Sequence, residues 1–75
     1  MSTIIIENGF EISIYRDHLP PHVHLRKAGE EVRIRLDTIE IYRQPYMNKK
    51  DLKNALSLVA KYKKDLTKKW REING

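Results

Sequence analysis

The stretch HVHLRKAGEEVRIRL, residues 22–36, decides the fold. Apolar and polar residues alternate strictly on both sides of Ala28-Gly29, which is typical of two half-buried strands joined by a tight turn. Because side chains alternate between the two faces of a strand, the loop length decides which residues meet. A loop of even length keeps the apolar residues on one face, whereas a three-residue loop divides them. We therefore predict a β-hairpin that pairs Leu25 with Val32 and Val23 with Ile34.

The same register brings basic and imidazole side chains together on the second face of this hairpin. We expect that face to look outwards, because the apolar face must be covered. The predicted pairs are His24 with Arg33, His22 with Arg35, and Arg26 with Glu31.

Another hairpin is predicted in residues 3–15. Asn8-Gly9 lies between two runs of β-branched and aromatic residues, and these two residue types suit the positive φ angles of a type I′ turn. The pairs that this two-residue turn predicts are Ile5 with Ile12 and Thr3 with Ile14.

Residues 49 to about 73 are predicted to form an amphipathic helix. Asn48 is a favourable N-cap, and Asp51 stands three residues later, as in a capping box. Apolar residues at helical spacing form one stripe, which comprises Leu52, Ala55, Leu56, Val59, Tyr62, Leu66, Trp70 and Ile73. Cations occupy the opposite side, namely Lys49, Lys50, Lys53, Lys61, Lys64, Lys68 and Arg71.

These elements predict a single α+β domain over residues 1–75, with a β-sheet in residues 1–47 and a basic amphipathic helix in residues 48–74. The sheet is antiparallel and built from two hairpins, and residues 38–43 are a candidate fifth strand at its edge. We expect the helix to lie across the apolar face of the sheet. The residues beneath it would be Ile12, Ile14, Val23, Leu25, Val32 and Ile34.

Composition limits the class of protein. The chain has no cysteine, which excludes disulfides and thiolate metal ligands and fits a cytoplasmic protein. Its apolar runs are far shorter than the roughly 20 residues of a membrane span, so we expect neither a membrane partner nor a signal peptide. A core built from 75 residues supplies little stability, and we therefore expect a homodimer.

The net charge of +5 is concentrated in the predicted helix. Residues 1–48 hold 6 basic and 7 acidic residues, a net charge of −1, whereas residues 49–75 hold 9 basic and 3 acidic residues, a net charge of +6. This asymmetry indicates an acidic partner, either nucleic acid or an acidic protein surface. The sequence has no helix-turn-helix, paired-aromatic or zinc-finger motif, so nucleic acid would be contacted through its backbone.

Three interpretations account for the histidines, which all lie within seven residues around Pro20-Pro21. A metal site would use His18, His22 and His24, with Asp17 as a further ligand or acceptor. Because arginines are expected beside two of these histidines and would repel a cation, we predict no metal and no cofactor, and keep this ligand set as the alternative.

A structural interpretation is also open, in which the segment is a rigid turn and strand without chemistry of its own.

A catalytic site is the remaining interpretation. Histidines beside arginines can act as bases near neutral pH, and arginines can hold a phosphodiester and stabilise the charge that develops on it. These side chains would suit a small metal-independent ribonuclease. The candidate catalytic residues are His22, His24, Arg33 and Arg35.

Residues 17–24, DHLPPHVH, resemble the DHxPPHxH signature of a family of small bacterial proteins known only as a domain of unknown function. The matching residues are Asp17, His18, Pro20, Pro21, His22 and His24. The family is also similar in the order of its elements and in a late tryptophan that corresponds to Trp70. Its members are often described as toxin–antitoxin components, so the resemblance implies a cognate toxin–antitoxin protein as a partner. It implies no catalytic mechanism.

Three functions are compatible with these features. The leading hypothesis is a small interaction module of a toxin–antitoxin, mobile-element or phage cassette, which binds nucleic acid or a protein through its His/Arg sheet face and lysine-rich helix. The second is a toxin-like ribonuclease. The third is a phage-type inhibitor that docks on an acidic protein surface. On the first and third hypotheses the protein is not an enzyme.

Overall fold

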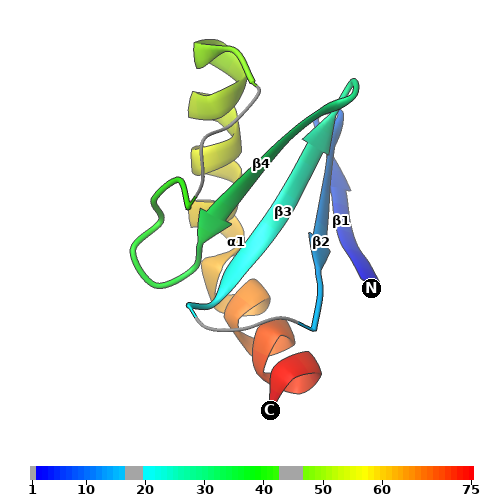
Figure 1. Cartoon of the computed structure of the whole chain (residues 1–75), viewed down its shortest axis with the longest axis vertical. Coiled ribbons are helices and arrows are strands. Elements are labelled where there is room, and N and C mark those ends of the chain that lie inside the picture. The colour runs from blue at the N-terminus through cyan, green and yellow to red at the C-terminus, as the bar shows by residue number, and fades with distance from the viewer. Residues whose placement is uncertain (1, 17–19, 43–46) are drawn as a thin grey trace.

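The computed structural model describes residues 2–16, 20–42 and 47–75. Four strands and one helix follow each other along the chain (Figure 1): β1 (Ser2–Glu7), β2 (Phe10–Ile14), β3 (His22–Lys27), β4 (Glu30–Arg35) and α1 (Lys49–Asn74). The strands form one antiparallel sheet in the order β1-β2-β3-β4. The helix packs against β2, β3 and β4. The predicted α+β fold is confirmed.

The turn between β3 and β4 has the predicted even length. Ala28 and Gly29 have φ angles of 49° and 81°, so both lie in the left-handed region that a type I′ turn requires. The register of the two strands is the predicted one on both faces. The observed pairs include Leu25 with Val32, Val23 with Ile34, His24 with Arg33, His22 with Arg35 and Arg26 with Glu31.

The hairpin of β1 and β2 follows the prediction only near its turn. Ile5 pairs with Ile12 as expected, but the register shifts between Thr3 and Ile5. Thr3 therefore faces Ser13, and the predicted pair of Thr3 with Ile14 is wrong. The shift has the form of a β-bulge, which inserts one residue into one strand and which no turn rule predicts.

The described part of the candidate fifth strand is a returning loop. It contributes one isolated bridge, between Ile34 and Ile41, and Ile39 has a φ of 53°, which no regular strand accommodates. The predicted fifth strand is therefore not found in residues 38–42, and Arg43 lies outside the described residues. Two backbone hydrogen bonds hold the loop to the outer edge of β4: Arg35 N donates to Glu40 O at 2.8 Å and Tyr42 N donates to Arg33 O at 2.8 Å.

The helix begins and ends close to its predicted bounds. The side-chain oxygen of Asn48 accepts a hydrogen bond from the Asp51 backbone N–H at 2.8 Å, which confirms the predicted N-cap. Leu58 was absent from the predicted stripe, yet it is buried together with Ala55, Val59, Leu66 and Trp70. The remaining stripe residues, Leu52, Leu56, Tyr62 and Ile73, are partly buried against the core.

The hydrophobic core lies between α1 and one face of the sheet. All six sheet residues that were expected beneath the helix are buried. Two further apolar side chains join them, Phe10 at the start of β2 and Leu36 directly after β4. The buried sheet-side residues are Phe10, Ile12, Ile14, Val23, Leu25, Val32, Ile34 and Leu36.

Candidate functional site

The two histidines of β3 are buried. His22 is 2% exposed and His24 is 6% exposed, so the prediction that their face looks outwards is wrong for these two side chains. Aromatic rings enclose them. The Tyr15 ring meets His24 edge-on with ring centroids 4.4 Å apart, and Tyr42 stacks on His22 with centroids 4.9 Å apart. The side chains of His22, His24, Tyr15, Tyr42 and Trp70 are called the histidine–aromatic cluster below.

The cluster forms where the sheet opens at one end. The pairing of β2 with β3 stops at Ser13 and His24, so the first two residues of β3, His22 and Val23, lie beyond the last pair. The Trp70 ring approaches the His22 ring there, with centroids 5.5 Å apart. At the same end of the sheet, the Asn74 side-chain amide donates to Tyr15 O at 3.2 Å. The carboxyl end of α1 is thus attached to the chain that leaves β2.

His24 has one satisfied and one unsatisfied ring nitrogen. Its Nδ1 lies 3.0 Å from Glu31 Oε1, and because a carboxylate only accepts, Nδ1 carries the proton. Its Nε2 is buried and has no hydrogen-bond partner among the described residues. Burial lowers the pKa of His24 below its usual value; Glu31 opposes this effect, and the positive charge of Arg33 adds to it. His24 is therefore a neutral imidazole whose Nε2 lone pair can accept a proton or a donor group.

His22 is oriented in a similar way but by the backbone. Its Nδ1 lies 2.8 Å from the carbonyl oxygen of Pro20, and a carbonyl can only accept. The rings of His22 and His24 have centroids 5.2 Å apart. Pro20 therefore contributes directly to the cluster, because the chain that it stiffens supplies the acceptor for His22.

The two candidate arginines behave differently. The Arg35 guanidinium donates two hydrogen bonds to Asp37, at 2.9 and 2.6 Å, and this pairing lowers the pKa of Asp37 to about 2. Arg35 is thus engaged with Asp37, although the register places it opposite His22. Arg33 is the arginine whose charge acts on His24.

The alternative metal set is only partly described. His22 and His24 belong to the cluster, whereas Asp17 and His18 lie outside the described residues. Within residues 2–16, 20–42 and 47–75, no three histidine, aspartate or glutamate side chains converge as metal ligands would.

Lowering the pH through the range of histidine titration is expected to destabilise the fold. The folded-state pKa of His24 lies below the usual histidine value of about 6.5, so the unfolded chain binds more protons as the pH falls. The stability contributed by the neutral imidazole is present above that value and is lost as the pH falls towards the folded pKa. Urea unfolding at pH values between about 5 and 7.5 measures this dependence. A His24→Gln variant should show a weaker dependence of its stability on pH. If the stability of the variant and of the unmodified protein changed equally with pH, His24 would not be the group responsible.

The cations of α1 form a second candidate surface. Six of them are exposed, and no described carboxylate lies within ion-pair distance of any of them; this basic helix face consists of Lys49, Lys50, Lys53, Lys64, Lys68 and Arg71. Lys61 was predicted to belong to it but pairs with Glu7 at 3.0 Å. Tyr62 also donates to Glu7, and both contacts lower the pKa of that carboxyl.

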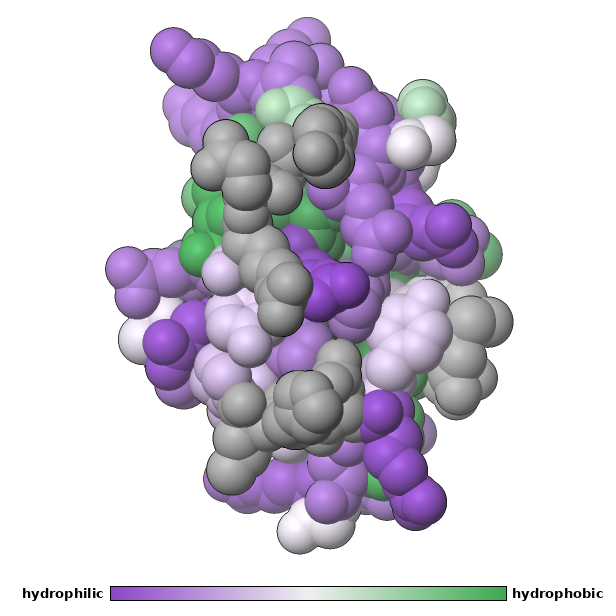
Figure 2. Space-filling model, in the orientation of Figure 1, coloured by the Kyte–Doolittle hydropathy of each residue, from purple (hydrophilic) through white to green (hydrophobic). Residues whose placement is uncertain are grey.

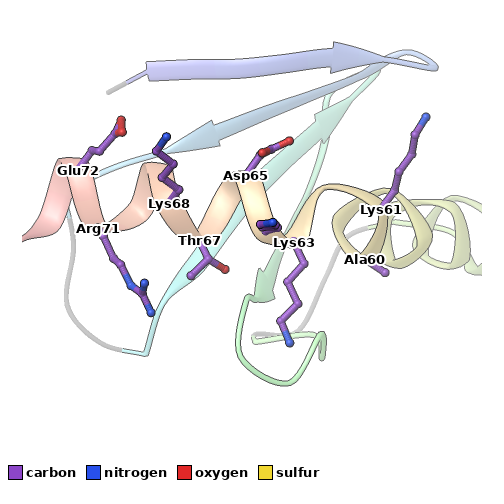
Figure 3. Close-up of a pocket in the computed structure, with 9 residues that line it drawn as sticks. Ala60, Lys61, Lys63, Asp65, Thr67, Lys68, Arg71 and Glu72 are labelled. Carbon is purple, nitrogen blue, oxygen red and sulfur yellow. The ribbon is translucent and has the colours of Figure 1, made fainter.

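The second half of α1 presents its side chains in two directions around a shallow hollow (Figure 3). Lys61, Asp65, Lys68 and Glu72 point to one side, and Lys63, Thr67 and Arg71 point to the other. Positive side chains therefore lie on both sides, whereas the carboxylates of Asp65 and Glu72 lie on one. These two carboxylates therefore lie along one flank of the helix.

The two candidate surfaces do not form one continuous site. The helix lies across the apolar face of the sheet (Figure 1), and the cations lie on the exposed side of the helix, opposite its buried residues. In the orientation of Figure 1, β3 and β4 lie partly in front of α1, and Figure 2 shows in the same orientation that hydrophilic residues predominate on the surface facing the viewer. The imidazoles of His22 and His24 are buried, whereas the cations of the basic helix face are exposed. The two surfaces therefore need separate functional explanations.

Sequence reasoning missed the partners of the histidines. Glu31 was paired with Arg26, and the two lie 3.9 Å apart, but Glu31 also reaches His24. The register contained this signal, because Glu31 is diagonal to His24 across the hairpin and diagonal neighbours lie within reach of long side chains. Tyr15 and Trp70 carried no comparable signal, since neither lies in the β3–β4 hairpin.

Fold and cluster together define a small α+β domain with a buried histidine pair where the end of the sheet meets the end of the helix. The chain belongs to the family described as Domain of unknown function (DUF4160), whose profile matches residues 9–71. The match includes the second strand, the β3–β4 hairpin and most of α1. No curated protein and no solved structure matches the chain.

Among the described residues, no helix is long and apolar enough to cross a membrane.

Proposed function

We propose that the protein is a small nucleic-acid-binding module that contacts the sugar–phosphate backbone through the basic helix face. The observation that carries this proposal is the set of six exposed cations on one helix without ion-pair partners among the described residues. Cations that are not neutralised within the protein can replace the counterions of nucleic-acid phosphates, and release of those ions drives binding.

The length of the face fits several phosphates. Its outermost members, Lys49 and Arg71, are 22 residues apart, which corresponds to about 33 Å along an α-helix. Lysines act as point charges without the fixed geometry that reading a base edge requires. We therefore expect binding to depend on charge and shape and to vary little with base sequence.

Fluorescence anisotropy with labelled single-stranded RNA and duplex DNA tests the proposal. The unmodified protein should lose at least about tenfold in affinity between roughly 50 and 200 mM salt, as expected for several phosphate contacts. The double variant Lys64→Gln/Lys68→Gln should bind more weakly, with a shallower dependence on salt by about two phosphate contacts.

The matched control is Lys63→Gln/Lys69→Gln, which removes the same charge from the same helix. Lys63 donates to the backbone oxygen of Asp37 and Lys69 pairs with Glu72, so neither belongs to the basic helix face. The affinity of this control variant for nucleic acid should stay close to that of the unmodified protein. Equal losses in the two double variants would mean that only net charge matters. Absence of binding at the lower salt would refute the proposal and favour an acidic protein partner.

Membership of a toxin–antitoxin or mobile-element cassette is proposed on the resemblance of residues 17–24 alone. In that setting the protein would act with a cognate protein encoded beside it. Growth arrest on expression of this chain, relieved by its gene neighbour, would support a toxin role. The reverse dependence would support an antitoxin role, and no growth effect in either arrangement would count against both.

A second candidate function is metal-independent cleavage of RNA, and the arrangement at His24 favours it. Glu31 fixes the proton on Nδ1, which leaves Nε2 as the group that could accept a proton from a ribose 2′-hydroxyl. Because His24 is only 6% exposed, RNA would have to displace part of the cluster before it could react. Cleavage that persists in EDTA and disappears in His24→Gln would support this function. Intact RNA after prolonged incubation would exclude it.

A further inference from the structure

The two edges of the sheet differ in how the chain covers them. The loop after β4 runs along the outer edge of that strand and pairs with it through two backbone hydrogen bonds and the bridge between Ile34 and Ile41. β1 forms the opposite edge, and no described segment pairs with its outer side (Figure 1). The sheet therefore has one protected and one open edge. Open edges present unpaired backbone donors and acceptors to other chains.

The open edge is apolar. β1 has the sequence STIIIE, and Ile4 and Ile5 are partly buried against the core. Two large hydrophobic residues are exposed among the described residues, and Ile6 is the more exposed of them, at 75%. The helix packs on β2, β3 and β4, so β1 extends past the cover that α1 provides. The core thus reaches the edge of the sheet without being closed there.

Edge strands in soluble proteins usually carry devices against pairing, such as lysine, proline or a β-bulge. The sequence of β1 contains neither lysine nor proline. Its irregularity lies between Thr3 and Ile5, which leaves Ile5 to Glu7 in regular register with β2. The exposed Ile6 belongs to this regular part. The half of β1 next to the turn is therefore an unprotected template for another strand.

We infer that the outer edge of β1 is the interface of a homodimer, in which β1 pairs antiparallel with β1 of a second copy to form an eight-stranded sheet. The strand is complementary to itself. An antiparallel pairing centred on Ile6, within the regular part of the strand, sets isoleucine against isoleucine and places Glu7 opposite Ile5 of the second copy. Glu7 is the only charged residue of β1, and it meets its own copy only if the pairing is centred on Glu7 itself. No like charges therefore oppose dimer formation along the strand.

The covered edge determines the size of the assembly. After two copies pair through β1, both outer edges of the joined sheet are β4 edges, and the loop of residues 36–42 already pairs with each of them at Arg33 to Arg35. A further strand could pair only with the short remainder of β4 next to its turn. The association is isologous and closes at two copies, whereas two open edges would allow a filament.

Light scattering coupled to size-exclusion chromatography tests the interface directly. Over protein concentrations from about 1 to 200 μM, in the range where small interfaces associate, the mass should rise towards twice 8.9 kDa and then remain constant. Ile6→Lys places a charge on the exposed edge and should weaken the dimer by an order of magnitude or more. Ile6 is too exposed for this change to damage the core.

Ile41→Lys is the matched control, because Ile41 is the second exposed large hydrophobic residue, at 38%, and lies at the covered edge of β4. This variant should dimerise like the unmodified protein. Hydrogen exchange should show concentration-dependent protection of backbone amides in residues 4–7. The interface is wrong if the unmodified protein stays monomeric at the highest concentration. Equal weakening by both substitutions, or protection confined to α1, would also overturn it.

Discussion

Replacing Trp70 by alanine is expected to lower the free energy of unfolding by about 3–5 kcal/mol, the usual cost of truncating a buried aromatic residue. Trp70 is 5% exposed and joins the end of α1 to the His22 ring and the core. A domain of 75 residues has a total stability of roughly 4–11 kcal/mol. Much of the variant should therefore be unfolded at 25 °C, as measured by far-UV circular dichroism and urea titration.

Two further substitutions, one at Trp70 and one at a neighbouring exposed residue, test whether the loss of stability comes from the packing of the Trp70 ring. Trp70→Phe keeps an aromatic ring and should retain most of the stability that the alanine variant loses. Lys68→Ala changes an exposed residue of the same helix and should alter stability by less than about 0.5 kcal/mol. A Trp70→Ala variant that unfolds at the same urea concentration as the unmodified protein would show that the end of α1 contributes little to the fold.

Replacing Glu31 by alanine is expected to cost about 1–3 kcal/mol, because it removes the acceptor of a buried donor. His24 already has an unsatisfied Nε2, and loss of Glu31 would leave its Nδ1–H without a partner as well. The Glu31 side chain is 42% exposed, so water can partly replace it and the cost should lie in the lower half of this range. Urea unfolding at neutral pH measures the change.

Glu30→Ala is the control for this prediction, since Glu30 is the preceding residue of β4 and pairs with Lys27 across the hairpin. It removes the same charge without touching His24 and should have a smaller effect. Glu31→Gln keeps a side-chain oxygen that can accept the Nδ1–H, so it should recover part of the lost stability. If all three variants were equally stable, the contact between Glu31 and His24 would be of no consequence for folding.

The features that could be predicted from sequence are set by local chemistry. Alternation over residues 22–36 and the two positive-φ residues of the turn determine the register of β3 with β4 without reference to the rest of the chain. The helix start follows from Asn48 and Asp51, which are three residues apart and satisfy each other. These rules depend on interactions within one hairpin or one helical turn, and such interactions can be recognised in a single sequence.

The features that could not be predicted depend on contacts between distant segments. The burial of His22 and His24 requires Tyr15, Tyr42 and Trp70, which come from three separate parts of the chain and converge only after the sheet and helix have packed. Binary patterning treats a histidine on the polar face as exposed, because it contains no information about what the loops place over that face. The bulge in β1 escaped prediction for a related reason, since the turn fixes register only next to itself.

Trp70 also gives this protein a built-in reporter of its folding kinetics. It is the only tryptophan in the sequence, and it lies where the end of α1 meets the beginning of β3. The two hairpins close over short loops and form quickly, whereas the contact of Trp70 with His22 joins residues 48 positions apart, a separation at which loop closure costs more. In a stopped-flow experiment, tryptophan fluorescence will therefore follow the docking of the helix, while hairpin formation leaves it unchanged.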